Sequence, residues 1–185
     1  MHLITAPALT ALVCGMAVLT TQPAGAQQPL SDRALVASAR SAAPASISDR
    51  ATIVDLQQRT LHEGTNGWVC MPDDPNIPND SPMCLDEPWL GFVTAYMSKR
   101  PPEVTRIGFG YMLRGDMPVS NTDPFSTGPT AENQWLADGG PHIMMLVPDA
   151  ALLNEMSTDP HNGGPWVMWK GTPYAHVMIP AERRK

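Results

Sequence analysis

The most strongly patterned stretch of the chain lies near its C-terminus, where residues 163–181 read GGPWVMWKGTPYAHVMIPA. Side chains alternate between two faces on both sides of a Gly-Thr-Pro turn at 171–173, so this stretch is predicted to form an antiparallel hairpin. One face brings together Trp166, Met168, Lys170, Tyr174, His176 and Met178, with Met168 opposite His176 and Trp166 opposite Met178. The other face carries Val167, Trp169, Ala175, Val177 and Ile179 and is predicted to face the core.

Other segments add one clear helix and more strands. A helix is predicted from Glu87 onward, because Asp86 can cap it and Pro88 fits its first turn. Residues 104–113 alternate as a strand with glycines on one face, which suits close packing against another element, and a strand follows within 141–149. The order of elements lacks a βαβ rhythm. The predicted class is therefore α+β, with a mainly antiparallel sheet, one or two helices, long Pro/Asp-rich loops and one disulfide.

Four regions are predicted along the chain. Residues 1–26 are an apolar run that ends in Ala-Gly-Ala, which is typical of a secretory signal peptide, with an uncleaved anchor as the alternative. Residues 27–50 are rich in Ala and Ser and are predicted to be a flexible leader or a marginal helix. A single globular domain is predicted at 51–181, followed by a basic tail at 182–185. The protein is therefore expected in the periplasm or outside the cell.

Cysteine usage fits that location. Cys14 falls within the predicted signal peptide, which leaves Cys70 and Cys84 in the mature chain. In an oxidising compartment such a pair most simply forms one disulfide, which would stabilise the fold by about 3 kcal/mol. A pair of metal thiolates is the alternative, although the spacing lacks the close C-x-x-C arrangement of zinc sites.

The charge of the chain limits its partners. The formal net charge is −6, and an acidic domain without a basic stripe argues against binding to nucleic acid or to anionic membrane surfaces. The sequence after residue 26 contains no second long apolar segment, so no membrane association is expected once the signal is removed. A small ligand or a metal ion is the partner that the sequence leaves open.

Two His-x-Met pairs suggest a soft-metal site. His142 and Met144 are spaced as His176 and Met178 are, and alternation places each pair on one face of its strand. Together with Met168, these imidazole and thioether groups form a set that selects Cu(I), and Trp166 could cover a bound ion through a cation–π contact. The ligand set is similar to that of small periplasmic copper chaperones. The alternative is structural, since methionine commonly fills cores and a strand histidine is more often structural than a ligand.

An enzymatic alternative uses the same face. Three groups there can transfer protons, and the predicted roles are His176 as base with Lys170 and Tyr174 as electrophilic helpers of a small hydrolase or lyase. The imidazole could be oriented by one of three carboxylates, namely Glu63, Asp138 or Asp149. The sequence contains no Gly-x-Ser-x-Gly elbow, no His-Glu-x-x-His motif and no phosphate-binding glycine loop.

Two loops remain. The first offers oxygen donors for calcium as an alternative to copper, although their spacing is not that of an EF-hand. These donors are Asp73, Asp74, Asn76, Asn79 and Asp80. The second is a long polar connection at 115–141, which would suit an envelope protein that acts by interaction.

Four phrases in the chain carry a resemblance: LHEGTNGWVCMPDDP, PMCLDEPWL, NTDPF and GGPWVMWKGTPYAHVMIP. With them the chain resembles an uncharacterised family of exported proteobacterial proteins over about residues 51–181. The resemblance implies a Gram-negative periplasmic or secreted setting and carries no activity and no site residues. The function predicted from the residues is that of an exported binding module.

Overall fold

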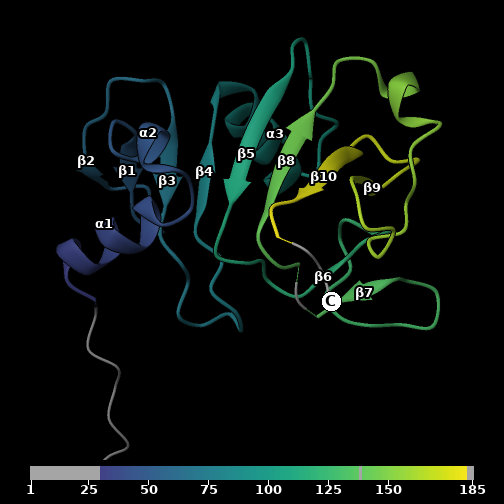
Figure 1. Ribbon diagram of the computed structural model, residues 1–185, viewed down its shortest axis with the longest axis horizontal. Coiled ribbons are helices and arrows are strands. Elements are labelled where there is room, and N and C mark those ends of the chain that lie inside the picture. Colours follow the sequence, from purple (N-terminus) through teal and green to yellow (C-terminus); the bar gives the residue numbers. More distant parts are fainter. Residues whose placement is uncertain (1–29, 138, 183–185) are drawn as a thin grey trace, which may run out of the picture.

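The computed structural model describes residues 30–137 and 139–182, so the predicted signal peptide and all but the first residue of the predicted basic tail lie outside the described residues. Within this part the elements follow in the order α1 (Asp32–Arg40), α2 (Ala45–Ser48), β1 (Thr52–Val54), β2 (Thr60–His62), β3 (Val69–Met71), β4 (Met83–Leu85), α3 (Glu87–Met97), β5 (Gly108–Met112), β6 (Val119–Ser120), β7 (Trp135–Leu136), β8 (His142–Leu146), the 3₁₀ helix η1 (Ala150–Leu153), β9 (Trp166–Met168) and β10 (His176–Pro180). The fold is α+β, as predicted (Figure 1).

One mixed sheet organises these elements. Its strand order is β2-β1-β3-β4-β5-β8-β10-β9, and every neighbouring pair is antiparallel except β1 with β3. A separate two-stranded ribbon is formed by β6 and β7 inside the segment 115–141, which the sequence suggested only as a long connection. No helix in residues 30–137 or 139–182 is long and apolar enough to cross a membrane.

Helix α3 covers one face of the sheet and begins where the sequence predicts. Asp86 caps it, since its Oδ1 accepts a hydrogen bond from the amide of Trp89 at 3.1 Å while its Oδ2 accepts one from the amide of Phe109 at 2.6 Å. The helix lies close to β5 because glycines face it. A Cβ placed on Gly108 would lie 2.7 Å from the Cβ of Pro88, so the predicted close packing of the glycine face is confirmed.

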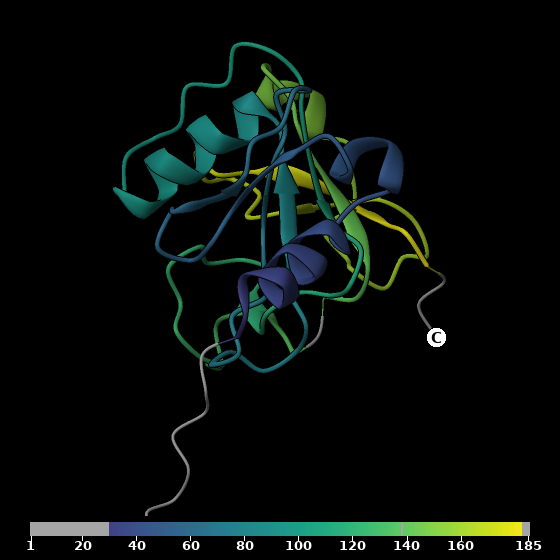
Figure 2. The same ribbon diagram turned by 90° about the vertical axis from the view of Figure 1, so that its left-hand side faces the viewer.

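Helices α1 and α2 cover the opposite face of the sheet (Figure 2). The alanine–cysteine core beneath them consists of Ala39, Ala42, Ala43, Ala51, Ile53, Cys70 and Cys84, all buried. Segment 27–50, predicted as a flexible leader or a marginal helix, thus contains two helices that pack on the sheet within its described residues. Short alanine side chains let α1 approach the strands closely, and Ser31 caps the helix at the amide of Ala34.

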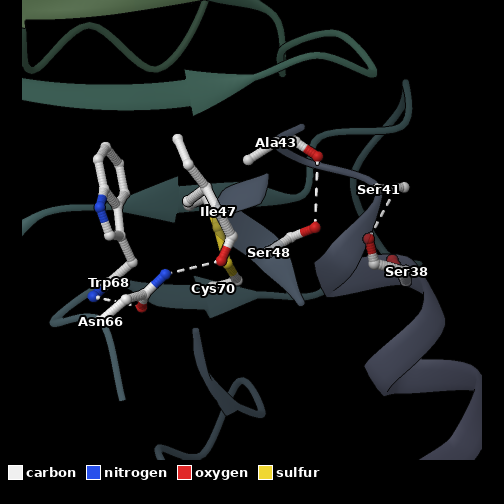
Figure 3. The surroundings of a disulfide bond; sticks show 9 residues. Ser38, Ser41, Ala43, Ile47, Ser48, Asn66, Trp68 and Cys70 are labelled. Carbon is white, nitrogen blue, oxygen red and sulfur yellow. Dashed lines mark hydrogen bonds between the residues drawn. A yellow bond between two sulfur atoms is a disulfide. The ribbon is translucent and has the colours of Figure 1, made fainter. Parts of the chain in front are cut away.

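The predicted disulfide between Cys70 and Cys84 is confirmed, and the two residues are directly paired across β3 and β4. Figure 3 shows its surroundings, in which α2 lies over the bond. The side-chain amide of Asn66 donates to the carbonyl of Ile47 at 2.8 Å, and the hydroxyl of Ser48 donates to the carbonyl of Ala43 at 3.4 Å. The Asn66 bond ties α2 to the loop that leads into β3, and the Ser48 bond ties α2 to its connection with α1.

The C-terminal hairpin has the predicted register over its strands, with His176 opposite Met168 and Met178 opposite Trp166. The alternation ends at Trp169, whose φ of 55° turns the chain. Its indole therefore lies on the α3 side of the sheet, which corrects the prediction that it shares the face of Val167. At this edge of the sheet the amide of Val167 donates to Ser157 at 2.8 Å, and that of Trp169 donates to Asn121 at 2.8 Å.

Candidate functional site

A cavity of about 230 Å³ lies between α3 and the sheet. We call it the methionine cavity, because its walls include Met83, Met97, Met112, Met117, Met144, Met168 and Met178. The chain has twelve methionines in all, so this one cavity concentrates most of them. Aromatic rings complete the apolar wall, contributed by Trp89, Phe92, Tyr96 and Trp169. Two side chains of the wall, His176 and Asp116, can carry charge.

Strand register places the thioethers of the sheet beside His176. Met168 pairs with His176 across β9 and β10, and Met178 pairs with Met144 across β10 and β8. Directly paired residues have Cα atoms about 4.5–5.5 Å apart, and residues two apart on one strand share a face about 7 Å apart. Four of the five metal ligands predicted from the sequence therefore form one continuous patch in the wall of the cavity.

Burial and one hydrogen bond define the state of His176. The residue is 2 % exposed, and burial lowers the pKa of its imidazole from 6.5 to about 4, although the carbonyl of Tyr174 opposes this effect. A neutral ring is therefore present at pH 7. Its Nδ1 lies 2.9 Å from that carbonyl, which can only accept, so Nδ1 carries the proton and Nε2 keeps its lone pair. Nε2 is thus the ring nitrogen available to a ligand in the cavity.

Aromatic rings surround His176 in the wall of the cavity. The ring centroids of Trp169 and Trp89 lie 5.0 and 5.2 Å from that of His176, both in edge-to-face geometry. Tyr96 of α3 stacks on Trp169 at 5.4 Å and on Phe125 at 5.4 Å. The hydroxyl of Tyr96 also donates to the carbonyl of Pro124 at 2.7 Å. The segment around Phe125 is thereby fastened to α3 beside the cavity.

Asp116 and His142 form a second polar group. His142 is fully buried, and its Nδ1 lies 2.7 Å from the carbonyl of Gly140. Its Nε2 lies 4.0 Å from a carboxylate oxygen of Asp116, and among the described residues it has no hydrogen-bond partner. In the sheet His142 pairs with Pro180 of β10 and Met112 of β5. Pro180 lies four residues beyond His176 on β10, so the two histidines are at different levels of the sheet. His142 is therefore the one predicted metal ligand that does not line the methionine cavity.

The remaining predicted site residues have other contacts. Trp166, predicted to bind ligand, is fully buried and donates from Nε1 to Asn121 at 3.0 Å, outside the cavity wall. Lys170 donates from Nζ to the carbonyls of Asn154 at 2.7 Å and Met156 at 3.1 Å, on the η1 side of the sheet. It does not share the face of His176, because the turn at Trp169 reverses the alternation.

Tyr174 is also engaged, since its hydroxyl donates to the carbonyl of Arg100 at 3.1 Å. The structure therefore does not direct Lys170 and Tyr174 toward the free nitrogen of His176. Of the three carboxylates predicted as orienting groups, Glu63 is exposed, Asp138 lies outside the described residues, and Asp149 caps η1 by accepting from Ala151 at 2.9 Å. The group that orients His176 is the Tyr174 carbonyl instead.

The oxygen donors proposed for calcium have separate partners. Asp73 accepts from Ser81, Asp74 accepts from Asn76, and Asp80 pairs with Arg114 at 2.7 Å. The side-chain amide of Asn79 donates to the carbonyl of Asp116 at 3.1 Å. Across residues 30–137 and 139–182, no three His, Cys, Asp or Glu side chains gather where they could hold a metal ion.

Several wall residues were missed by the sequence reasoning. Met83, Met97, Met112 and Met117 come from four separate segments, and no periodic pattern connects them. The methionine content of the chain was the one signal that could have pointed to such a cavity. Trp89 is a further missed residue: its Nε1 is buried and, within the described part of the chain, has no acceptor.

Comparison with protein families, with curated proteins and with solved structures found no match to this chain. The resemblance to an exported proteobacterial family therefore stays a prediction.

Proposed function

We propose that the protein is a small binding module whose ligand site is the methionine cavity between α3 and the sheet. One observation carries this proposal: an apolar cavity of about 230 Å³ contains a neutral imidazole whose Nε2 is available to a ligand. Binding sites are commonly concave and mostly apolar, with a few placed polar groups that orient the ligand. Methionine walls suit this role because an unbranched, polarisable side chain can adapt to its contents.

The geometry supports binding better than proton transfer. A hydrolase or lyase would need partners for His176 within hydrogen-bond reach of the reacting groups. Lys170 and the Tyr174 hydroxyl instead donate to backbone carbonyls elsewhere. An interaction role for segment 115–141 is less favoured. Phe125, a large apolar side chain of this segment, stacks on Tyr96 of the same chain and is not directed only toward a partner.

The test uses methionine methyl groups as local reporters. Protein labelled with ¹³C at the methionine methyls is titrated with benzene, a probe that fits apolar cavities of this size. We expect the methyl resonances of Met144, Met168 and Met178 to shift, while those of Met145 and Met156, which lie outside the cavity wall, stay in place. Equal shifts at all sites, or none at any, would overturn the proposal.

A pair of variants on α3 sharpens the test. Val93 lines the cavity, whereas its neighbour Thr94 is exposed. Val93→Trp should fill the cavity and abolish the benzene-induced shifts, and Thr94→Trp should leave them unchanged. If both variants still bound benzene at the same methyls, the ligand site would have to lie elsewhere.

A further inference from the structure

We infer that the ligand of the methionine cavity is a soft monovalent metal ion, Cu(I), held by Nε2 of His176 and by the thioether sulfurs of Met168 and Met178, with Met144 as a further donor. This inference depends on the proposed function, since it names the ligand class of the same cavity. The His142–Met144 and His176–Met178 pairs of the sequence thus contribute one imidazole to the site and not two.

The donor set selects the metal. Thioether sulfurs are soft ligands and favour Cu(I) among the biological metals, and an imidazole is compatible with it. Register places Met168 directly opposite His176 and Met144 directly opposite Met178, all on the face that α3 covers. Each methionine has three rotatable bonds beyond its Cα, so the sulfurs can converge on an ion beside the imidazole without moving the strands.

A hydrogen bond orients the imidazole of His176 for metal binding through Nε2. The carbonyl of Tyr174 fixes the proton on Nδ1 and sets the ring orientation, which is the role that outer-shell partners have in established metal sites. The indoles of Trp89 and Trp169, with centroids 5.2 and 5.0 Å from the imidazole, can shield the ion and add a cation–π contact.

Charge and hardness argue for a singly charged soft ion. Among the described wall residues Asp116 is the one carboxylate, and it lies beside His142 rather than in the patch of sulfur donors. Calcium takes six to eight oxygen ligands, and structural zinc takes four thiolate, imidazole or carboxylate ligands. The wall offers mainly neutral sulfur.

The experiment is an anaerobic Cu(I) titration with ascorbate present and bicinchoninate as competing chelator, followed by native mass spectrometry. We expect one Cu(I) per chain and no retained Zn²⁺. Met168→Leu and Met178→Leu remove a sulfur while conserving volume, so each should keep the fold and lower Cu(I) affinity by about 10- to 100-fold. Met145→Leu is the matched control, because Met145 neighbours Met144 on β8 but pairs with Val177 and lies outside the cavity wall.

X-ray absorption at the copper edge should show both sulfur and nitrogen scatterers, and His176→Gln should remove the nitrogen. If His176→Gln does not fold, the leucine variants still decide the question. Cu(I) affinity that is unchanged in both leucine variants, or lowered equally in Met145→Leu, would overturn the copper site. Benzene-induced methyl shifts without Cu(I) retention would overturn this inference alone, whereas loss of both signals would overturn the proposed function as well.

Discussion

The two faces of the sheet are packed in opposite ways. The alanine–cysteine core under α1 and α2 uses short side chains and a covalent cross-link, so helix and strands approach closely. The face under α3 uses large, flexible methionines and aromatic rings and encloses a cavity of about 230 Å³. Close-packed interiors tolerate little change in volume, whereas methionines can rearrange. The comparison indicates that stability is concentrated on one face and adaptability on the other.

The largest loss of stability is expected for a substitution at Gly64. This glycine packs on the backbone of residues 50–52, which leads into β1 and the alanine–cysteine core. A Cβ there would lie 2.2 Å from the backbone nitrogen of Thr52 and 2.3 Å from the carbonyl carbon of Ala51. Backbone atoms cannot yield as side chains do, so Gly64→Ala should lower the free energy of unfolding by more than about 3 kcal/mol. Urea denaturation measures the effect, and a cost below about 1 kcal/mol would contradict the rigidity of this region.

Removal of the disulfide should come next. The bond closes a loop with a sequence separation of 14, and the Cys70→Ala/Cys84→Ala double variant should lose about 3 kcal/mol of stability in the chain-entropy model. The benzene-induced shifts of the cavity methionines should persist in the folded variant, because the cross-link lies on the other face. If those shifts disappeared, the two faces would not be independent.

Acid should destabilise the α3 face through His176. Its pKa is lowered by burial to about 4 in the folded protein, against 6.5 as the ordinary value. The unfolded chain therefore binds more protons between pH 6.5 and 4, and stability falls as the pH decreases through this window. One pKa unit corresponds to about 1.4 kcal/mol, so the loss approaches about 2 to 3 kcal/mol.

Unfolding free energies measured from pH 7 to 4 check this expectation. His161, which is exposed, provides the control: His161→Ala should keep the pH dependence of the parent protein. A stability that stays flat between pH 6.5 and 4.5 would show that His176 is not buried in a neutral state.

The smallest effect is expected at Gly110, on the methionine face. A Cβ there would lie 2.8 Å from Cε of Met144 and 2.9 Å from Cδ2 of Leu85, which are ends of side chains. Gly110→Ala should therefore cost only about 1 kcal/mol, since those ends can move. Thermal unfolding of Gly110→Ala and Gly64→Ala, measured side by side, compares the two losses of stability. A loss at Gly110 equal to or larger than that at Gly64 would contradict the difference between the two faces.

Local signals predicted part of this structure. The cap at Asp86, the close-packed face of Gly108 and the pairing of Met168 with His176 all follow from short-range patterns, and the structure contains them.

Tertiary contacts decided the rest. Residues 32–40 and 45–48 are helical, and the buried alanines in and between these two helices pack against distant strands, a benefit that local composition does not reveal. Trp169 leaves its predicted face because its backbone turns where its amide bonds to Asn121, 48 positions away in a separate loop. Part of the candidate site was predictable from the sequence. Strand alternation predicted the His–Met patch, but the cavity also needs walls from α3 and from the segment around Met117, which no local pattern connects to it.

The outer edge of β9 has a consequence for self-association. Exposed strand edges are templates on which other chains can add, and they promote aggregation. Here the outward amides of Val167 and Trp169 already donate to Ser157 and Asn121, so an incoming strand would have to displace two native hydrogen bonds. The edge nearest the methionine cavity is thus protected from fibril-like extension by loops of the same chain, and the three-residue β9 offers little length on which such growth could begin.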